Sequence, residues 1–342
     1  MHRSGRAELA KRVGDNVEKV WRPMRIHEDP VPDSPIRDRV IEGLARNRSP
    51  GLHFAGNFAQ VAFDPAPPGE SRLRMADGAH LAEADGTTSL CAVALLADLA
   101  LGVAIRSRLQ PESRLATVAL HLQMTGVPLR GKHAAHGQFE SFLDGASGRQ
   151  GLARVRVENE AGSIAFGSAG FMVLPPPPGV ELHPVVRERG VPKLPEADLD
   201  ATERSVMRHA DDALARAGAE HAFIAHFWGT AAEATPHGAR CVTPNGTQVA
   251  NRVGHVQGGI LVGIAGSTAR AALGRGWQLS SISSWFVSPG EGEQLETESV
   301  IEHRGRLTAV VRTRIAGIGG RRVLESVSSH ALARTPASAG ET

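Results

Sequence analysis

The sequence predicts an α+β protein that consists of two tandem repeats, each with one long apolar helix followed by four antiparallel strands. Three observations lead to this fold class. The chain has 342 residues, which is enough for about two domains. A run of prolines at residues 175–178 divides it, because proline neither continues a helix nor pairs inside a sheet. The same order of elements recurs in both parts, as in an internal duplication.

The expected organisation has five segments: a polar arm, a first repeat, a proline-rich linker, a second repeat and a flexible tail. Their predicted ranges, in this order, are 1–49, 50–174, 175–218, 219–334 and 335–342. The arm is interrupted by several prolines and contains a short helix at residues 36–46. The linker ends with a helix at residues 200–217, for which Asp200 is the predicted N-cap and Gly218 the stop.

Each repeat contains one helix that is apolar on nearly every face, at residues 87–109 and 258–273. Such helices are expected to be enclosed by a sheet. Apolar and β-branched runs between turn signals predict the strands. In the first repeat these are 58–63 and 72–75 before the helix, and 115–122, 136–143, 151–159 and 164–174 after it. In the second repeat they are 278–287, 295–303, 307–315 and 322–332, after an apolar segment at 223–228, with a turn at 317–320.

Composition and charge exclude several classes of protein. The formal net charge is only +2, which gives no electrostatic case for binding nucleic acid. Two cysteines, Cys91 and Cys241, form neither a disulfide framework nor a four-cysteine zinc site. The charged N-terminus lacks the apolar centre of a signal peptide, and the longest apolar run, residues 90–105, is too short to span a bilayer. We therefore expect a cytoplasmic protein that does not bind membranes.

The sharpest motif is the segment Asn-Arg-Val-Gly-His-Val-Gln-Gly-Gly-Ile-Leu at residues 251–261. Gly258 and Gly259 open a helix, where backbone N–H groups lack intrahelical partners and the helix dipole is positive. Glycine lets a carbonyl group approach this backbone without a Cβ in the way. The pair therefore suits the stabilisation of an oxyanion. The alternative is a glycine pair that only eases the packing of the helix on the sheet.

With Asn251 seven positions before Gly258, this segment resembles the signature of hotdog-fold acyl-CoA thioesterases of the phenylacetate and 4-hydroxybenzoyl-CoA type. The resemblance covers residues 50–174 and 223–332. It implies a double hotdog, in which a curved antiparallel sheet wraps each long helix. It also implies an oxyanion site at Gly258 and Gly259, and a catalytic acid eight positions after Gly258. That position is Gly266, so the second repeat lacks the acid.

Superposition of the repeats on Gly86 and Gly254 gives an offset of 168 residues, which aligns Gly266 with Asp98. The first repeat thus has the acid, in a helix segment that resembles the Leu-Ala-Asp-x-Ala helix of the family. It lacks the other groups. In place of Asn251, Gln257, Gly258 and Gly259 it has Glu83, Ser89, Leu90 and Cys91. In the family the glycine of one hotdog faces the acid of its partner, so the sequence predicts one site that pairs Gly258 with Asp98. The opposite pair, Leu90 with Gly266, has neither group.

Residue chemistry alone also marks Asp98, because a carboxylate among leucines is costly to bury unless it is paired or used. The alternative is an ion pair with an arginine such as Arg106, or a hydrogen bond to a helix cap. Thr117 follows on the next strand, where relatives place a hydroxyl that positions water, and Thr is also a common strand residue. We expect Asn251 and Thr117 to orient the acid or the water. The predicted substrate contacts are Gln257 and His255, with Arg304 and Arg306 at the phosphates of coenzyme A.

The predicted function is therefore hydrolysis of an acyl-CoA thioester at one composite site, by a homo-oligomer, either a dimer or a trimer of double hotdogs. Asp98 serves as general base or as direct nucleophile. No cofactor or metal is needed, and His133 with His136, or His221 with His226, lacks the nearby carboxylates of a metal site. Two alternatives stay open: a non-catalytic acyl-CoA-binding protein, and a hotdog hydratase or dehydratase. For the latter, His80 and Glu83 precede the first helix.

Overall fold

The computed structural model describes residues 36–146, 148–175, 190 and 193–333. The predicted arm before residue 36, the proline run after residue 175 and the tail lie outside the described residues. The arm contributes α2 (Ile36–Asn47). The first repeat contains α3 (Phe54–Phe58), β1 (Ala62–Asp64), β2 (Glu70–Met75), α4 (Leu90–Arg106), β3 (Arg114–Met124), β4 (His133–Gly145), β5 (Gly148–Asn159) and β6 (Gly162–Leu174). The linker contributes a short 3₁₀ turn at Glu196–Asp198 and α5 (Ala201–Arg216). The second repeat contains α6 (Phe223–Phe227), β7 (Glu233–Thr235), β8 (Gly238–Pro244), α7 (Gly258–Leu273), β9 (Trp277–Phe286), β10 (Gln294–Arg304), β11 (Thr308–Ala316) and β12 (Arg322–Leu332), with a short 3₁₀ turn at Ile318–Gly320.

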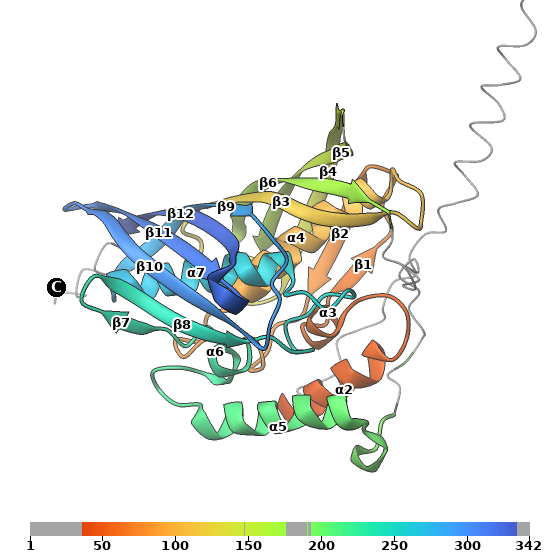
Figure 1. Cartoon of the computed structure of the whole chain (residues 1–342), viewed down its shortest axis with the longest axis horizontal. Coiled ribbons are helices and arrows are strands. Elements are labelled where there is room, and N and C mark those ends of the chain that lie inside the picture. Colours follow the sequence, from red (N-terminus) through yellow and green to blue (C-terminus); the bar gives the residue numbers. More distant parts are fainter. Residues whose placement is uncertain (1–35, 147, 176–189, 191–192, 334–342) are drawn as a thin grey trace, which may run out of the picture.

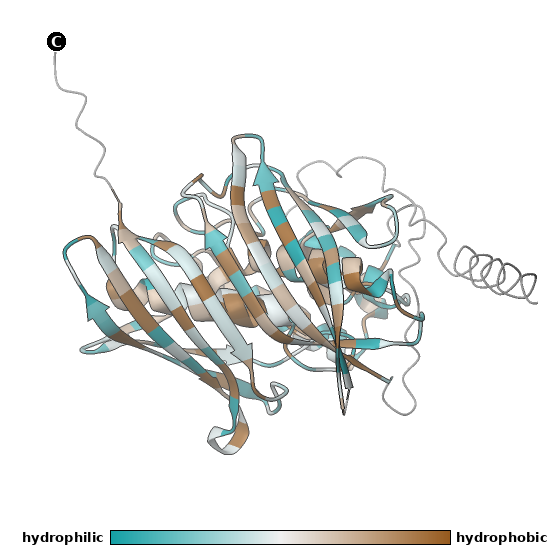
Figure 2. Ribbon diagram, turned by 90° about the horizontal axis from the view of Figure 1, so that it is seen from above, coloured by the Kyte–Doolittle hydropathy of each residue, from teal (hydrophilic) through white to brown (hydrophobic). Residues whose placement is uncertain are grey.

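All these strands form one antiparallel sheet in the order β1-β2-β4-β5-β6-β3-β9-β12-β11-β10-β8-β7. The order of the second half mirrors that of the first, and the halves join where β3 pairs with β9, with Leu122 opposite Ile282. The sheet curves over α4 and α7, while α2 and α5 lie together on the other side of these helices (Figures 1 and 2). Each repeat is a helix wrapped by its own half of the sheet. The predicted double-hotdog fold is confirmed.

The two central helices pack directly on each other because glycines on α7 remove the side chains that would separate them. A Cβ on Gly259 would lie 2.4 Å from the carbonyl oxygen of Ala94, and a Cβ on Gly263 would lie 2.3 Å from the Cα of Cys91. The helices run antiparallel, so the N-terminus of α7 lies beside the middle of α4. Their apolar side chains are almost all buried, which contributes about 1.5–3 kcal/mol for each leucine or isoleucine.

The loops that lead into α4 and α7 have the same backbone structure. An isolated bridge joins Ala82 to Thr88 in the first repeat and Ala250 to Val256 in the second. The turn within each loop needs a glycine with positive φ, which is +73° at Gly86 and +81° at Gly254. Each residue of the first loop and its equivalent in the second, such as Ala82 and Ala250, are 168 positions apart. The alignment of the repeats is therefore confirmed over the segments that lead into the two helices.

One predicted strand is wrong. Residues 58–63 do not form a strand, because α3 ends at Phe58, Gln60 has a φ of +51°, and only Ala62–Asp64 pairs with β2. The apolar segment at 223–228, for which no secondary structure is predicted, contains the short helix α6. The phenylalanines of these two helices pack across the repeats, with Phe58 and Phe227 ring centroids 5.2 Å apart, and this packing fixes the helical turns. The strands β7 and β8 are not among the predicted strands: β7 has only three residues, and β8 begins with glycine and ends with proline.

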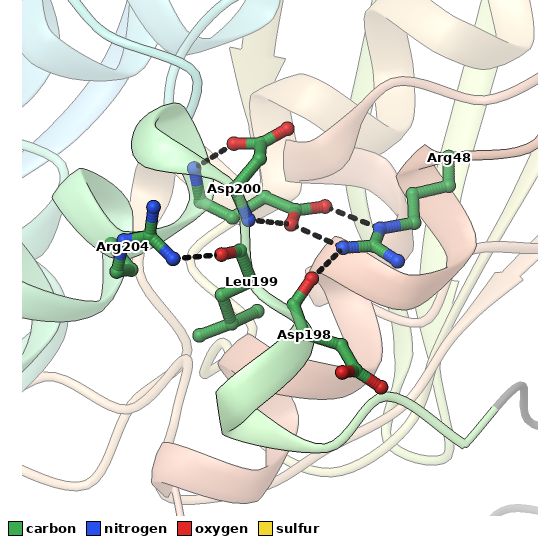
Figure 3. A network of polar contacts seen from close by, with 6 residues as sticks. Arg48, Asp198, Leu199, Asp200 and Arg204 are labelled. Atoms are coloured by element: carbon green, nitrogen blue, oxygen red, sulfur yellow. Dashed lines mark hydrogen bonds and ion pairs between the residues drawn. The ribbon is translucent and has the colours of Figure 1, made fainter.

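The N-terminus of α5 anchors the connector that follows α2, which we define as residues 47–52. Asp200 and Glu203 form a capping box, so the predicted N-cap is confirmed, and α5 ends at Arg216 shortly before Gly218. Arg48 of the connector binds both carboxylate oxygens of Glu203, at 2.7 and 2.6 Å, and donates to the carbonyl oxygen of Asp198 at 2.7 Å (Figure 3). The bidentate geometry holds the connector in place.

Candidate active site

Asp98 lies in the middle of α4, is only 5% exposed, and faces the N-terminus of α7. Its neighbours on the helix are leucines and alanines. The ion pair with Arg106 considered above is absent from the described residues, since Arg106 Nη1 instead donates to the carbonyl oxygen of Ser113 at 2.7 Å. Among the residues that the structure describes, the buried carboxylate thus has no cation beside it, and neutral hydrogen-bond donors hold it.

Thr117 on β3 is one of these donors. Its Oγ1 donates to Oδ1 of Asp98 at 3.2 Å. The residue lies directly before an irregularity in the pairing of β3 with β6, between Thr117 and Ala119. This bulge changes the alternation of side chains at the point where β3 passes the carboxylate.

Gln257 is the second donor. It is the N-cap residue of α7, and its Oε1 accepts the backbone N–H of Ile260 at 3.0 Å. Because that N–H can only donate, the amide orientation is fixed, and Nε2 faces Asp98. Nε2 donates to Oδ2 of Asp98 at 2.5 Å. The sequence analysis assigned Gln257 to substrate, whereas the structure places its amide on the carboxylate.

The two glycines at the start of α7 have different surroundings. A Cβ on Gly258 would lie 2.8 Å from Oγ1 of Thr117 and 3.2 Å from Oδ2 of Asp98, so this glycine keeps the space beside the carboxylate open. Gly259 instead lets α7 touch α4, and its backbone N–H also faces Asp98. Gly259 therefore has the packing role considered in the sequence analysis for the glycine pair, but it eases the packing of α7 on the helix α4 and not on the sheet.

The environment of Asp98 sets its protonation. Burial raises its pKa from the ordinary 3.8 to about 6, while hydrogen bonds from Thr117, Gln257 and the Gly259 N–H work in the opposite direction by stabilising the charged form. The positive end of α7 acts in the same direction as these hydrogen bonds. A carboxylate with a pKa near 6 is mostly ionised at neutral pH and accepts a proton more readily than an ordinary aspartate.

Asn251 and His255, two further predicted residues, contact each other within the loop before α7. The Oδ1 of Asn251 accepts the backbone N–H groups of Val253 and His255, at 3.0 and 3.2 Å, so Asn251 shapes its own loop. His255 is partly exposed on the same loop, and burial, with a smaller contribution from Arg114, lowers the pKa of its imidazole.

Arg304 and Arg306 lie at the opposite end of α7. Arg304 donates to the carbonyl oxygen of Leu273, the last residue of the helix, and its guanidinium lies 5.5 Å from the ring centroid of Trp277. Arg306 follows in the turn between β10 and β11. At 1.5 Å per residue, the length of α7 separates Leu273 from Gly258 by roughly 22 Å. The structure does not bring these arginines to Asp98.

The position related to this cluster by the internal symmetry contains other residues. There Leu90 replaces Gly258 and Gly266 replaces Asp98, and a Cβ on Gly266 would lie 2.5 Å from Cδ2 of Leu90. Leu279 takes the place of Thr117, since each lies directly before the irregularity in its strand. Ser89 takes the place of Gln257, and its buried Oγ has no hydrogen-bond partner in the described part of the chain.

Other features that the sequence raised do not form sites. Within the described ranges, no group of three or more metal-ligating side chains is assembled. His133 is buried at the start of β4, whereas His136 points outward and contacts Glu158 at 3.1 Å. His80 is buried against the ring of Phe58, with ring centroids 5.2 Å apart. None of the helices in the described residues is long and apolar enough to cross a membrane.

Several solved structures are similar to this chain at low sequence identity. No protein-family model and no curated protein matches the chain. A protein from Lactobacillus plantarum, provisionally named oleoyl thioesterase, has a TM-score of 0.49 and 9% identity over 79% of this chain and 99% of its own. An acyl-CoA thioesterase II from Mycobacterium marinum has a TM-score of 0.44 and 15% identity over 80% and 96%. A protein of unknown function with a hotdog fold, from Alicyclobacillus acidocaldarius, has a TM-score of 0.46 and 10% identity over 77% and 94%.

Proposed function

We propose that the protein is a thioester hydrolase that converts an acyl-CoA to a free acid and coenzyme A. The observation that carries the proposal is the cluster of Asp98, Thr117, Gln257 and Gly258, in which a buried carboxylate from one repeat meets an open helix N-terminus from the other. A thioester carbonyl beside Gly258 would accept the backbone N–H of Gly258 at the start of α7, because the N–H of Gly259 faces Asp98 and that of Ile260 donates to Gln257. The same carbonyl would lie next to the base.

In this reaction Asp98 takes a proton from water as the water oxygen attacks the thioester carbon. The negative charge that develops on the carbonyl oxygen is stabilised by the N-terminus of α7, and the sulfur leaves with its bonding electrons as the tetrahedral intermediate collapses. We favour this route over direct attack by Asp98, because Thr117 and Gln257 each donate to one of its oxygens. These bonds hold the carboxylate still and reduce its nucleophilicity.

A thiol-release assay over short, long and aromatic acyl-CoAs tests the proposal. Release of free coenzyme A in equal amount to the free acid is expected. A change in double-bond absorbance without thiol would indicate a hydratase or dehydratase instead, and thermal stabilisation by acyl-CoA without turnover would indicate a binding protein. The homo-oligomeric state and the cytoplasmic location stay predictions, which size-exclusion chromatography with light scattering and cell fractionation would test.

A further inference from the structure

The loop that carries Gln257 into α7 is held by one arginine. The guanidinium of Arg252 donates to four carbonyl oxygens of the connector at residues 47–52. Nε bonds Gly51 and Nη1 bonds Asn47, both at 2.9 Å, while Nη2 bonds Ser49, also at 2.9 Å, and Leu52. Four of the five N–H donors of the side chain are thus used on the backbone of the connector, which leads from the arm into the first repeat.

The connector is itself held, by α5 on one side and by Asn57 of the first repeat on the other, so Arg252 ties the loop to a point that Asn57 fixes on the first repeat. Arg48 binds Glu203 and the carbonyl oxygen of Asp198, as Figure 3 shows. Asn57 Nδ2 donates to the carbonyl oxygen of Leu52 at 2.7 Å. Asn47, one of the partners of Arg252, ends α2, where the helix dipole is negative and favours a cation.

The internal symmetry supplies a control for the role of this contact. The loop before α4 has the same bridge, the same positive-φ glycine and the same hydrogen bond back to the preceding segment, from Ser89 to Leu81 where the second loop has Gln257 to Val249. Yet Ala84 stands in the position of Arg252. The loop conformation therefore forms without an arginine at this position. What Arg252 adds is a tie across the two repeats.

We propose that Arg252 is a positioning residue of the active site proposed above, and that its tie to the connector sets where Gln257 and Gly258 stand relative to Asp98. The proposal rests on the thioesterase function. Asp98 belongs to the first repeat and the loop to the second, so the distances within the site depend on the alignment of the two repeats. A group that is misplaced by about 1 Å can cost a hundredfold in rate.

The test compares Arg252→Ala with Arg130→Ala. Arg130 is a matched control because it also donates to loop carbonyls, those of Asp85 and Gly86, but it holds the loop before α4. We expect kcat of Arg252→Ala to fall by roughly ten- to a hundredfold, with KM changed by less than about threefold. Added methylguanidinium should restore part of this loss, and Arg252→Lys should be intermediate. Arg130→Ala should keep wild-type kcat.

The pH profile provides a readout that a general loss of stability would not move. Asp98 is faced by Thr117 from β3 and by Gln257 and Gly259 from the start of α7, all neutral groups. If the loop slips, Gln257 no longer donates to the carboxylate, so the acid limb of the Arg252→Ala profile should move to higher pH. An unchanged kcat and acid limb in Arg252→Ala, or an equal loss of kcat in Arg130→Ala, would overturn the proposal.

Hydrogen exchange separates this inference from the proposed function. Should the wild-type chain release no thiol, the tie can still be examined directly. Faster exchange of residues 251–261 in Arg252→Ala, with these residues unchanged in Arg130→Ala, would support it. Equal protection of residues 251–261 in the wild type and in Arg252→Ala would refute it, whatever the chain catalyses.

Discussion

At one end of the crossing between α4 and α7, Gly258 faces Asp98, whereas at the other end Leu90 faces Gly266. The backbone at the two ends is closely similar, since the loops that precede the helices share their bridges and their positive-φ glycines. The first end holds a carboxylate with two side-chain hydrogen-bond donors beside the N-terminus of α7. The second is filled by apolar side chains. The comparison shows that both junctions keep the helix packing, whereas only one of them has the polar groups that the proposed reaction would use.

Each end is stabilised in its own way. At the apolar end, Leu90 occupies the space next to Gly266, and Ile282 and Leu279 each lie 3.6 Å from where a Cβ on that glycine would be. This is ordinary core packing, which stabilises the fold. At the polar end, a buried carboxylate costs free energy that hydrogen bonds only partly offset. Apolar packing and the candidate polar site thus lie at two related positions of the fold.

The largest expected effect comes from a side chain added to each glycine. In Gly258→Val the new Cβ would press on Thr117 Oγ1 and occupy the space beside Asp98, so thiol release should fall by about 10³-fold or more. In Gly266→Val the new atoms meet the flexible end of Leu90, so activity should persist and the free energy of unfolding should fall by about 1–3 kcal/mol. Steady-state assays and denaturant titrations of both variants measure this. Full activity in Gly258→Val would mean that the wrong end has been assigned.

Asp98→Asn should lower kcat by about 10² to 10⁴ while acyl-CoA binding persists, because the amide keeps the shape but cannot accept the proton. The same change should stabilise the fold above pH 6. Folding raises the pKa of Asp98 from 3.8 to about 6, so the folded state binds this proton more tightly than the unfolded state does. The free energy of unfolding is therefore highest below about pH 4 and falls as the pH rises through about 6. The total decrease is about 3 kcal/mol at most. Asparagine avoids that loss. Turnover near the wild-type rate would leave Asp98 without a catalytic role.

The acid limb of the wild-type pH profile should reflect the same group. As a general base Asp98 must be ionised, so kcat/KM should rise with pH through about 6 and then level off. The profile of Asp98→Asn should lack this limb. An inflection near pH 4 in the wild type would show that the carboxylate which controls the reaction is an exposed one.

Much of the fold could be predicted because its signals are local. The glycine pair at residues 258–259 and the apolar run after it give α7 its bounds, and Asp200 with Glu203 marks the start of α5. The short helices α3 and α6 could not be predicted, since the packing of Phe58 against Phe227 across the two repeats decides their conformation. The strand β8 could not be predicted either, because it forms by pairing along its whole length with β10, which is distant in the sequence.

The candidate site divides in the same way. Asp98, Thr117 and Gly258 were chosen from the sequence and lie together in the structure, and their catalytic roles stay predictions. The contact of Gln257 with Asp98 depends on an amide orientation that the Ile260 N–H fixes in three dimensions. Its position directly before Gly258, where a side chain caps the helix, is the signal that indicates it. The sequence could not predict that Arg304 lies far from Asp98, because this depends on the contact of Arg304 with Leu273 at the C-terminal end of α7.

The number of ligands per chain tests the central claim, that the two repeats together form a single site. Titration with a non-hydrolysable acyl-CoA analogue, followed by calorimetry, should saturate near one ligand per chain, since the second junction is filled by Leu90 and Leu279. Gly258→Val should weaken this binding and Gly266→Val should not. Two ligands per chain with equal affinity would contradict the account, because each repeat would then hold a complete site.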